Sequence, residues 1–157
     1  GEPVRTRVGH SFIKAKMAET NAVFGGEHSA HYYFRDFWRA DSGMLAAMHV
    51  LAALGQQDKP LSEMMAKYNR YAASGEINSR LDSAEAQADR TEAVVKAFAD
   101  RAENVDRLDG VTVELKDGNW FNVRASNTEP LLRLNVEADT QEAVDALVKE
   151  ILAIIRA

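Results

Sequence analysis

The chain has 157 residues, of which 46% are hydrophobic and 27% charged, with a formal net charge of −5 and no cysteine. The acidic balance argues against a general binder of nucleic acid or anionic membranes, and the lack of cysteine excludes disulfides and thiolate metal sites. No apolar run approaches the roughly 18 residues of a membrane span, so we expect a cytoplasmic globular protein with no nucleic-acid or membrane partner.

The first half of the chain alternates between extended segments and helices. Residues 3–8 alternate apolar and polar side chains, which predicts a strand, and the apolar stripe of residues 11–20 predicts a helix. A short strand at 23–24 runs into two glycines, and an aromatic-rich strand returns at 31–34. Two further helices are expected at 44–54 and 59–71. This order is typical of the later half of an α/β domain.

The second half predicts a small α+β domain. Residues 72–75 are small and flexible, so we place a hinge there and divide the chain into domains at 1–72 and 73–157. Strand and helix patterns follow in the order strand, helix, strand, strand, strand, helix, at 76–81, 89–103, 111–115, 120–124, 131–137 and 140–155. This order implies one antiparallel sheet with two helices on one face.

The connection between the last two strands contains a donor-rich group of side chains. Arg124 ends one strand, and Ser126, Asn127 and Thr128 follow in the turn. One guanidinium, two hydroxyls and an amide around a small volume suit a phosphate dianion. Ser, Asn and Thr are also common turn formers that bond to their own backbone, so the residues alone leave a plain turn as an alternative.

A second polar group follows the paired glycines. Glu27, Ser29 and His31 alternate, so an extended segment would direct all three to one side, where they could bind sugar hydroxyls. An exposed polar strand facing water is the alternative. A metal site formed with His28 is disfavoured, because the glycines oppose the helix that it would need. His10, just before the first helix, is a candidate for proton transfer or sugar contact.

Three motifs resemble the α-D-phosphohexomutase family, the phosphomannomutase/phosphoglucomutase enzymes. Residues 124–130, Arg-Ala-Ser-Asn-Thr-Glu-Pro, are similar to the phosphate-binding loop of its C-terminal domain. Residues 26–31, Gly-Glu-His-Ser-Ala-His, are similar to its G-E-x-S-x-H sugar-recognition loop. Residues 8–14, Val-Gly-His-Ser-Phe-Ile-Lys, resemble the segment that precedes that loop. The motifs occur in the family's order, and the resemblance covers essentially the whole chain.

The resemblance implies part of an α/β third domain followed by a small, TATA-binding-protein-like fourth domain. It assigns sugar-hydroxyl binding to Glu27, Ser29 and His31, and phosphate binding to the loop at 124–128. The family's T-x-S-H-N phosphoserine segment and its D-x-D-x-D loop for Mg²⁺ are absent here. The resemblance therefore implies a C-terminal part of a mutase that interconverts hexose 6-phosphate and hexose 1-phosphate through a phosphoserine and a bisphosphate intermediate.

Expectations about partners and cofactors follow from the same resemblance. Mg²⁺ would bind to residues outside this chain, and the fragment itself would hold no metal and be inactive alone. Its partners would be a phosphorylated hexose and the missing N-terminal domains, and an open sheet edge invites self-association. His28 and Ala30 depart from the usual family loop, so mannose, glucose and glucosamine substrates stay open, including a phosphoglucosamine mutase. A non-catalytic binding or assembly module is the other alternative.

Overall fold

The structure is a computed structural model that describes residues 1–126 and 129–157. The chain divides into two compact units, Gly1–Tyr68 and Asn69–Ala157. Among the helices of the described residues, none combines the length and the apolar character that a membrane crossing requires. The assignment of domains to residues 1–72 and 73–157 stays a prediction.

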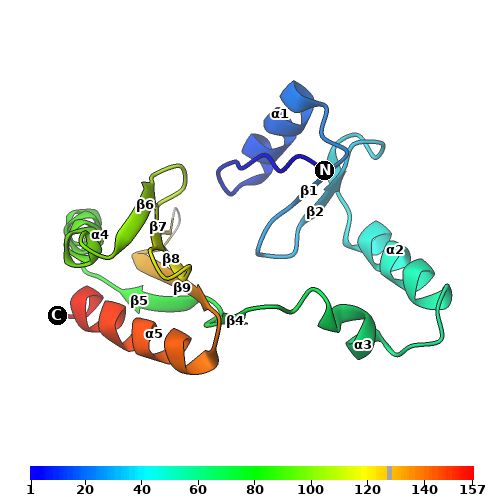
Figure 1. Ribbon diagram of the computed structural model, residues 1–157. Coiled ribbons are helices and arrows are strands. Elements are labelled where there is room, and N and C mark those ends of the chain that lie inside the picture. The colour runs from blue at the N-terminus through cyan, green and yellow to red at the C-terminus, as the bar shows by residue number, and fades with distance from the viewer. Residues whose placement is uncertain (127–128) are drawn as a thin grey trace. The chain divides into compact units, whose positions relative to one another are not determined.

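The first unit combines a small antiparallel sheet with three helices (Figure 1). Its elements, in chain order, are α1 (His10–Thr20), β1 (Phe24–Gly26), β2 (Tyr32–Phe34), β3 (Ala40–Asp41), α2 (Gly43–Gly55) and α3 (Leu61–Ala66). The strand order is β1-β2-β3. Ile13 and Met17 of α1 pack with Tyr33 of β2 to form its buried cluster, as the apolar stripe of the helix requires.

Three predictions in this unit differ from the structure. The strand expected at residues 3–8 is absent, because this largely exposed segment finds no neighbouring strand in the described chain to share backbone hydrogen bonds. The helix expected at 59–71 covers only Leu61–Ala66, and α2 runs through Gly55 rather than ending before it. The start of α2 is as predicted, since the Ser42 hydroxyl accepts a hydrogen bond from the backbone of Leu45 at 3.1 Å.

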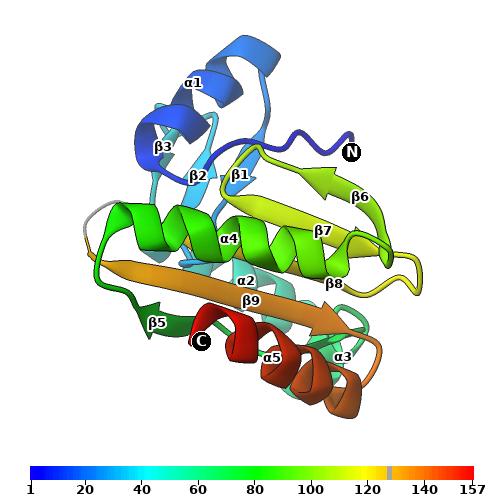
Figure 2. The same ribbon diagram turned by 90° about the vertical axis from the view of Figure 1, so that its left-hand side faces the viewer.

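The second unit is an antiparallel sheet covered on one face by two helices (Figure 2). Its elements are β4 (Ala72–Ala73), β5 (Ile77–Arg80), α4 (Ala84–Phe98), β6 (Ala102–Asp106), β7 (Val111–Leu115), β8 (Trp120–Ala125), β9 (Leu131–Ala138) and α5 (Gln141–Ile155). The strand order is β4-β9-β8-β7-β6, and β5 also pairs with β9. The predicted α+β class is confirmed.

Strict alternation in β8 and β9 builds the core of this unit. Phe121 and Val123 of β8 and Leu134 of β9 are at most 1% exposed and face the helices. Phe98 of α4 meets Phe121 edge to face, with ring centroids 4.9 Å apart. The intervening residues of both strands are only half-buried, so they lie on the sheet face that carries no helix.

Residues 72–75 and 84–106 differ from the prediction. Ala72 and Ala73 form β4, and the backbone N–H of Ser74 donates to the carbonyl of Val136 at 2.9 Å, so the hinge does not lie in these three residues. The helix expected at 89–103 begins at Ala84, because Ser83 caps it. Residues 102–106 are the edge strand β6, whose mostly polar residues carry no strand pattern, since an edge strand needs little apolar burial.

Candidate functional site

The predicted phosphate cup lies where β8 ends and β9 begins. Arg124 occupies the open face of the sheet because its neighbour Val123 is buried against the helices. The backbone N–H of Ser126 donates to the carbonyl of Leu131 at 2.8 Å, which holds Ser126 at the base of the connection. Asn127 and Thr128, the other two predicted members, lie outside the described residues.

Arg133 joins this site, although the sequence did not assign it. The antiparallel register places Arg133 of β9 directly opposite Arg124 of β8. Its terminal nitrogen Nη2 lies 3.4 Å from the Ser126 hydroxyl oxygen. Within residues 1–126 and 129–157, its buried Nε has no hydrogen-bond partner. The signal was available, because a hairpin with a short connection pairs residues at equal distances from the turn.

Both arginines are held loosely by carboxylates. Arg124 Nε lies 3.7 Å from Asp109, and the Arg133 terminal nitrogens lie 3.4 Å from Glu76 and 3.8 Å from Glu129. Charge-assisted hydrogen bonds are usually about 2.7–2.9 Å long. These contacts are longer, so the guanidinium groups are oriented without being engaged in tight bidentate pairs. A dianion with several oxygens can therefore draw both cations to itself.

The second candidate region is the connection between β1 and β2. It is not the extended segment that would align Glu27, Ser29 and His31; it is a tight turn. The backbone N–H of Glu27 donates to the His31 carbonyl at 3.0 Å, and that of Ala30 donates to the Glu27 carbonyl at 3.0 Å. Ala30 adopts a left-handed φ of 65°, which an alternating strand does not contain. The Ser29 hydroxyl still lies 3.5 Å from a Glu27 carboxylate oxygen.

Asp41 links the two candidate histidines. His31 Nδ1 lies 3.1 Å from Asp41 Oδ2, and His10 Nδ1 lies 3.6 Å from Asp41 Oδ1. The hydrogen bond with Asp41 raises the pKa of His31, and the same bond lowers the pKa of Asp41. The sequence did not assign Asp41 to this region. Nothing in the local pattern shows that a carboxylate ten residues after His31 returns to it.

Tyr33 is the other residue that the sequence did not assign to this region. Its hydroxyl donates to the Glu27 carboxylate from within the buried cluster, and its ring lies 5.8 Å from that of His10. Burial, followed by the bond to Glu27, raises the pKa of Tyr33. The region thus brings together His10, Glu27, Ser29 and His31, although through a turn and not the predicted extended segment, and Asp41 and Tyr33 orient them. Carboxylate, hydroxyl and imidazole groups in this arrangement can accept from and donate to vicinal hydroxyls.

A metal site is not built by the residues that the structure describes. Over that part of the chain, no three His, Asp or Glu side chains gather as ligands. The residues therefore do not fit a Mg²⁺ site, and we assign no chemical step to a metal here. The expectation that Mg²⁺ binds to residues outside this chain stays a prediction.

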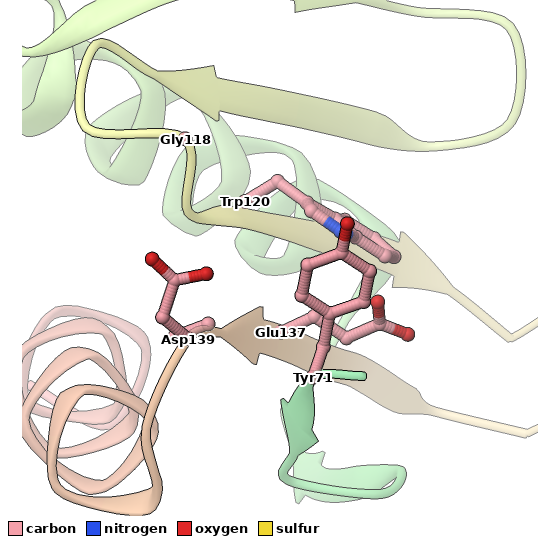
Figure 3. A pocket seen from close by; sticks show the side chains of 6 residues that line it. Tyr71, Gly118, Trp120, Glu137 and Asp139 are labelled. Carbon is pink, nitrogen blue, oxygen red and sulfur yellow. The ribbon is translucent and has the colours of Figure 1, made fainter. Parts of the chain in front are cut away.

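A cavity of about 210 Å³ lies at the other end of β8 (Figure 3). The side chains of Tyr71, Trp120, Glu137 and Asp139 line it. Its two carboxylates would repel a phosphate, whereas Arg124 lies toward the opposite end of the same strand. The cavity is therefore separate from the candidate anion site.

Comparison with known proteins bears on both regions. Residues 1–71 match the family described as phosphoglucomutase/phosphomannomutase, alpha/beta/alpha domain III, and residues 76–154 match its C-terminal domain. A phosphomannomutase of Salmonella montevideo is 44% identical over 99% of this chain and 34% of its own length. The phosphomannomutase of Methanocaldococcus jannaschii is 41% identical over 99% of this chain and 33% of its own length.

A solved structure agrees with these sequence relatives. It is a phosphoglucomutase/phosphomannomutase family protein from Burkholderia thailandensis, with a TM-score of 0.77 and 28% identity over 99% of this chain and 33% of that chain. The present chain thus spans about a third of the length of the proteins that it matches. The resemblance drawn from the three motifs is confirmed, and the chain belongs to the phosphoglucomutase/phosphomannomutase family.

Proposed function

We propose that this chain supplies the sugar-recognition and phosphate-binding regions of a mutase that interconverts hexose 6-phosphate and hexose 1-phosphate. Family membership and relatives named phosphomannomutase support the reaction class. The remaining two thirds of such an enzyme would carry the phosphoserine and Mg²⁺. In this proposal, the 157-residue chain binds the substrate and is inactive alone.

The observation that carries this proposal is the pairing of two arginines beside a hydroxyl. Arg124 and Arg133 are cross-strand neighbours on the open sheet face, and Ser126 lies within 3.4 Å of a nitrogen of Arg133. Two guanidinium groups supply up to ten N–H donors, and a hydroxyl adds another, which suits the several oxygens of a phosphate dianion. The proposal also assigns Asn127 and Thr128 to this cup.

The other end of the substrate is assigned to the turn of the first unit. In this proposal, Glu27, Ser29 and His31 bind the sugar hydroxyls, and His10 contacts the sugar or moves a proton. The Glu27 carboxylate is oriented by the Tyr33 hydroxyl, and His31 is oriented by Asp41. Preoriented polar groups discriminate well, because a substrate that lacks the matching hydroxyl leaves them unpaired.

The two regions have different tasks in catalysis. The cup holds the phosphate that does not react, while the turn holds the hexose, so binding free energy at one end orients the reaction at the other. In a reaction through a bisphosphate intermediate, each phosphate would occupy the cup in turn. This requires the cup to accept a phosphate on either C1 or C6, which recognition by charge and hydroxyl groups allows.

The cup is tested by following the amide signals of the 157-residue chain by NMR during titration with inorganic phosphate and with glucose 1-phosphate. We expect shifts at residues 124–126 and 133, and a weaker response at high salt. Arg124→Ala and Arg133→Ala should each weaken binding by about tenfold, because each removes charge-assisted hydrogen bonds.

Arg101→Ala is the matched control. It removes the same charge from the same unit, but Arg101 pairs with Glu150 of α5, on the helix-covered side of the sheet. The affinity of Arg101→Ala for inorganic phosphate and for glucose 1-phosphate should equal that of the unchanged chain. Equal losses in all three variants would reveal a nonspecific charge effect, and unchanged binding in Arg124→Ala would refute the cup.

A further inference from the structure

Asp41 lies between the two imidazole rings of the sugar-recognition region. One carboxylate oxygen is 3.1 Å from His31 Nδ1, and the other is 3.6 Å from His10 Nδ1. The two histidines come from different elements: His10 begins α1, and His31 immediately precedes β2. A single carboxylate thus faces the same ring nitrogen of both residues, which leaves the opposite nitrogen, Nε2, directed away from it in each ring.

The backbone around Asp41 holds this carboxylate in place. Asp41 is a strand residue of β3 and pairs with Tyr33, whose side chain is buried. The next residue, Ser42, donates its backbone N–H to the carbonyl of Tyr32 at 3.0 Å and caps α2 with its hydroxyl. Asp41 also lies just before the N-terminus of α2, where a helix favours negative charge. The backbone that carries this carboxylate is therefore anchored on both sides.

The chemistry of this contact sets the proton positions. An ionised carboxylate can only accept hydrogen bonds, so His31 Nδ1 must carry the proton that it shares with Asp41. In the neutral ring Nε2 then has a free lone pair and can accept a proton from a hydroxyl group. We propose that Asp41 is a positioning residue that holds neutral His31 as the Nδ1–H tautomer and draws His10 to the same carboxylate, so that Nε2 of each ring is presented to the sugar.

The other charged groups near His31 do not replace this role. Glu27 adds a favourable electrostatic contribution to the raised pKa of His31, but its carboxylate contacts Tyr33 and Ser29. His10 approaches the second oxygen of Asp41 at a longer distance, so it competes only weakly for the proton acceptor. Asp41 is thus the group that determines the tautomer of His31. The inference rests on the proposed function only in assigning Nε2 of His31 to the sugar; the position of the proton on Nδ1 does not depend on that role.

The test compares the unchanged 157-residue chain with Asp41→Asn. Correlation spectra of the imidazole nitrogens, recorded from pH 5 to 9, report the tautomer and the pKa of each histidine. In the unchanged chain, neutral His31 should carry its proton on Nδ1. Asparagine can instead donate its amide N–H to Nδ1, so the variant should move the proton to Nε2 and lower the pKa of His31. His28 and His49 serve as internal controls.

The amide spectra of the unchanged chain and of each Asp41 variant are compared to check that the fold is retained. Asp41→Ala, which lacks any acceptor, should also abolish the Nδ1–H tautomer; its loss in both variants supports the role. A neutral His31 protonated on Nε2 in the unchanged chain, or a tautomer that survives in both variants, would overturn it.

A second measurement separates this inference from the proposed function. Glucose 1-phosphate is added to each protein, and the Nε2 signal of His31 is followed together with the amides of residues 124–126. We expect the Asp41 variants to lose the Nε2 response and to keep the response to phosphate. If no sugar phosphate perturbs either region, the proposed function fails. The tautomer result would then still decide what Asp41 does to His31.

Discussion

Gly110 lies against the backbone of Arg124, so replacing it with alanine should displace the strand that carries Arg124 and thereby disturb the phosphate cup. A β-carbon at Gly110 would lie 2.4 Å from the carbonyl oxygen of Val123 and 2.8 Å from the α-carbon of Arg124. These atoms belong to β8 and cannot move like the end of a flexible side chain. Its φ of +67° also belongs to the left-handed region.

Gly118 provides the matched control for this substitution. It too has a positive φ, +86°, but a β-carbon there would meet nothing within 4 Å. The left-handed conformation alone costs a residue with a β-carbon about 1–2 kcal/mol. Forcing extra volume against packed backbone adds about 1–3 kcal/mol. We therefore expect a loss of about 1–2 kcal/mol for Gly118→Ala and about 2–5 kcal/mol for Gly110→Ala.

Urea unfolding followed by tryptophan fluorescence measures both variants. The chain has two tryptophans, so a Trp38→Phe background leaves Trp120 of β8 as the reporter of the second unit. Gly110→Ala should also weaken phosphate binding, because β8 must shift at Arg124, whereas Gly118→Ala should bind phosphate normally. Equal destabilisation by the two substitutions would refute the argument from close backbone approach.

Two further predictions concern the first unit. The helix α2 exposes three apolar side chains, each 60% or more exposed: Met44, Met48 and Leu51. Because an exposed apolar patch promotes association, the 157-residue chain should self-associate in analytical ultracentrifugation. Met48→Lys should shift the chain toward monomer. Because the pKa of His31 is raised in the folded protein, its contribution to folding stability is fully present below the ordinary value of 6.5 and is lost as pH rises through the folded pKa. Because the pKa of Asp41 is lowered, its contribution is fully present above 3.8 and is lost as pH falls through the folded pKa. The urea midpoint should therefore fall between pH 6 and pH 8.5, and His31→Asn should flatten that fall; an equal fall in the variant would exclude this pair as its cause.

The elements with strong periodicity could be predicted from the sequence. The helix α5 begins at Gln141, one residue after its predicted start, and the strands β7, β8 and β9 lie within a residue of their predicted bounds. Their apolar positions repeat with the period of the element, so local pattern and tertiary burial agree. The helix α4 was predicted to begin five residues too late and the strand β6 was not predicted, because a polar helix start and a polar edge strand carry no hydrophobic periodicity.

Some residues of the candidate sites could be identified from the sequence, and others could not. Arg124, Glu27 and His31 belong to contiguous motifs, so the sequence could identify them. Arg133 and Asp41 approach these residues only through strand pairing, across a turn or around a sheet. The short connection between β8 and β9 predicts that Arg133 pairs with Arg124, whereas no local pattern indicates that Asp41 returns to His31.

The arrangement of β8 and β9 links the stability of the second unit to its proposed function. Val123 pairs with Leu134 on the covered face, and the next pair along the ladder, Arg124 with Arg133, lies on the open face. A register slip of one residue would carry an arginine toward the helices and a buried apolar side chain into water. The apolar core therefore opposes any slip and keeps the two guanidinium groups opposite each other. The geometry of the anion site is thus set by the packing on the other side of the sheet as much as by the loop itself.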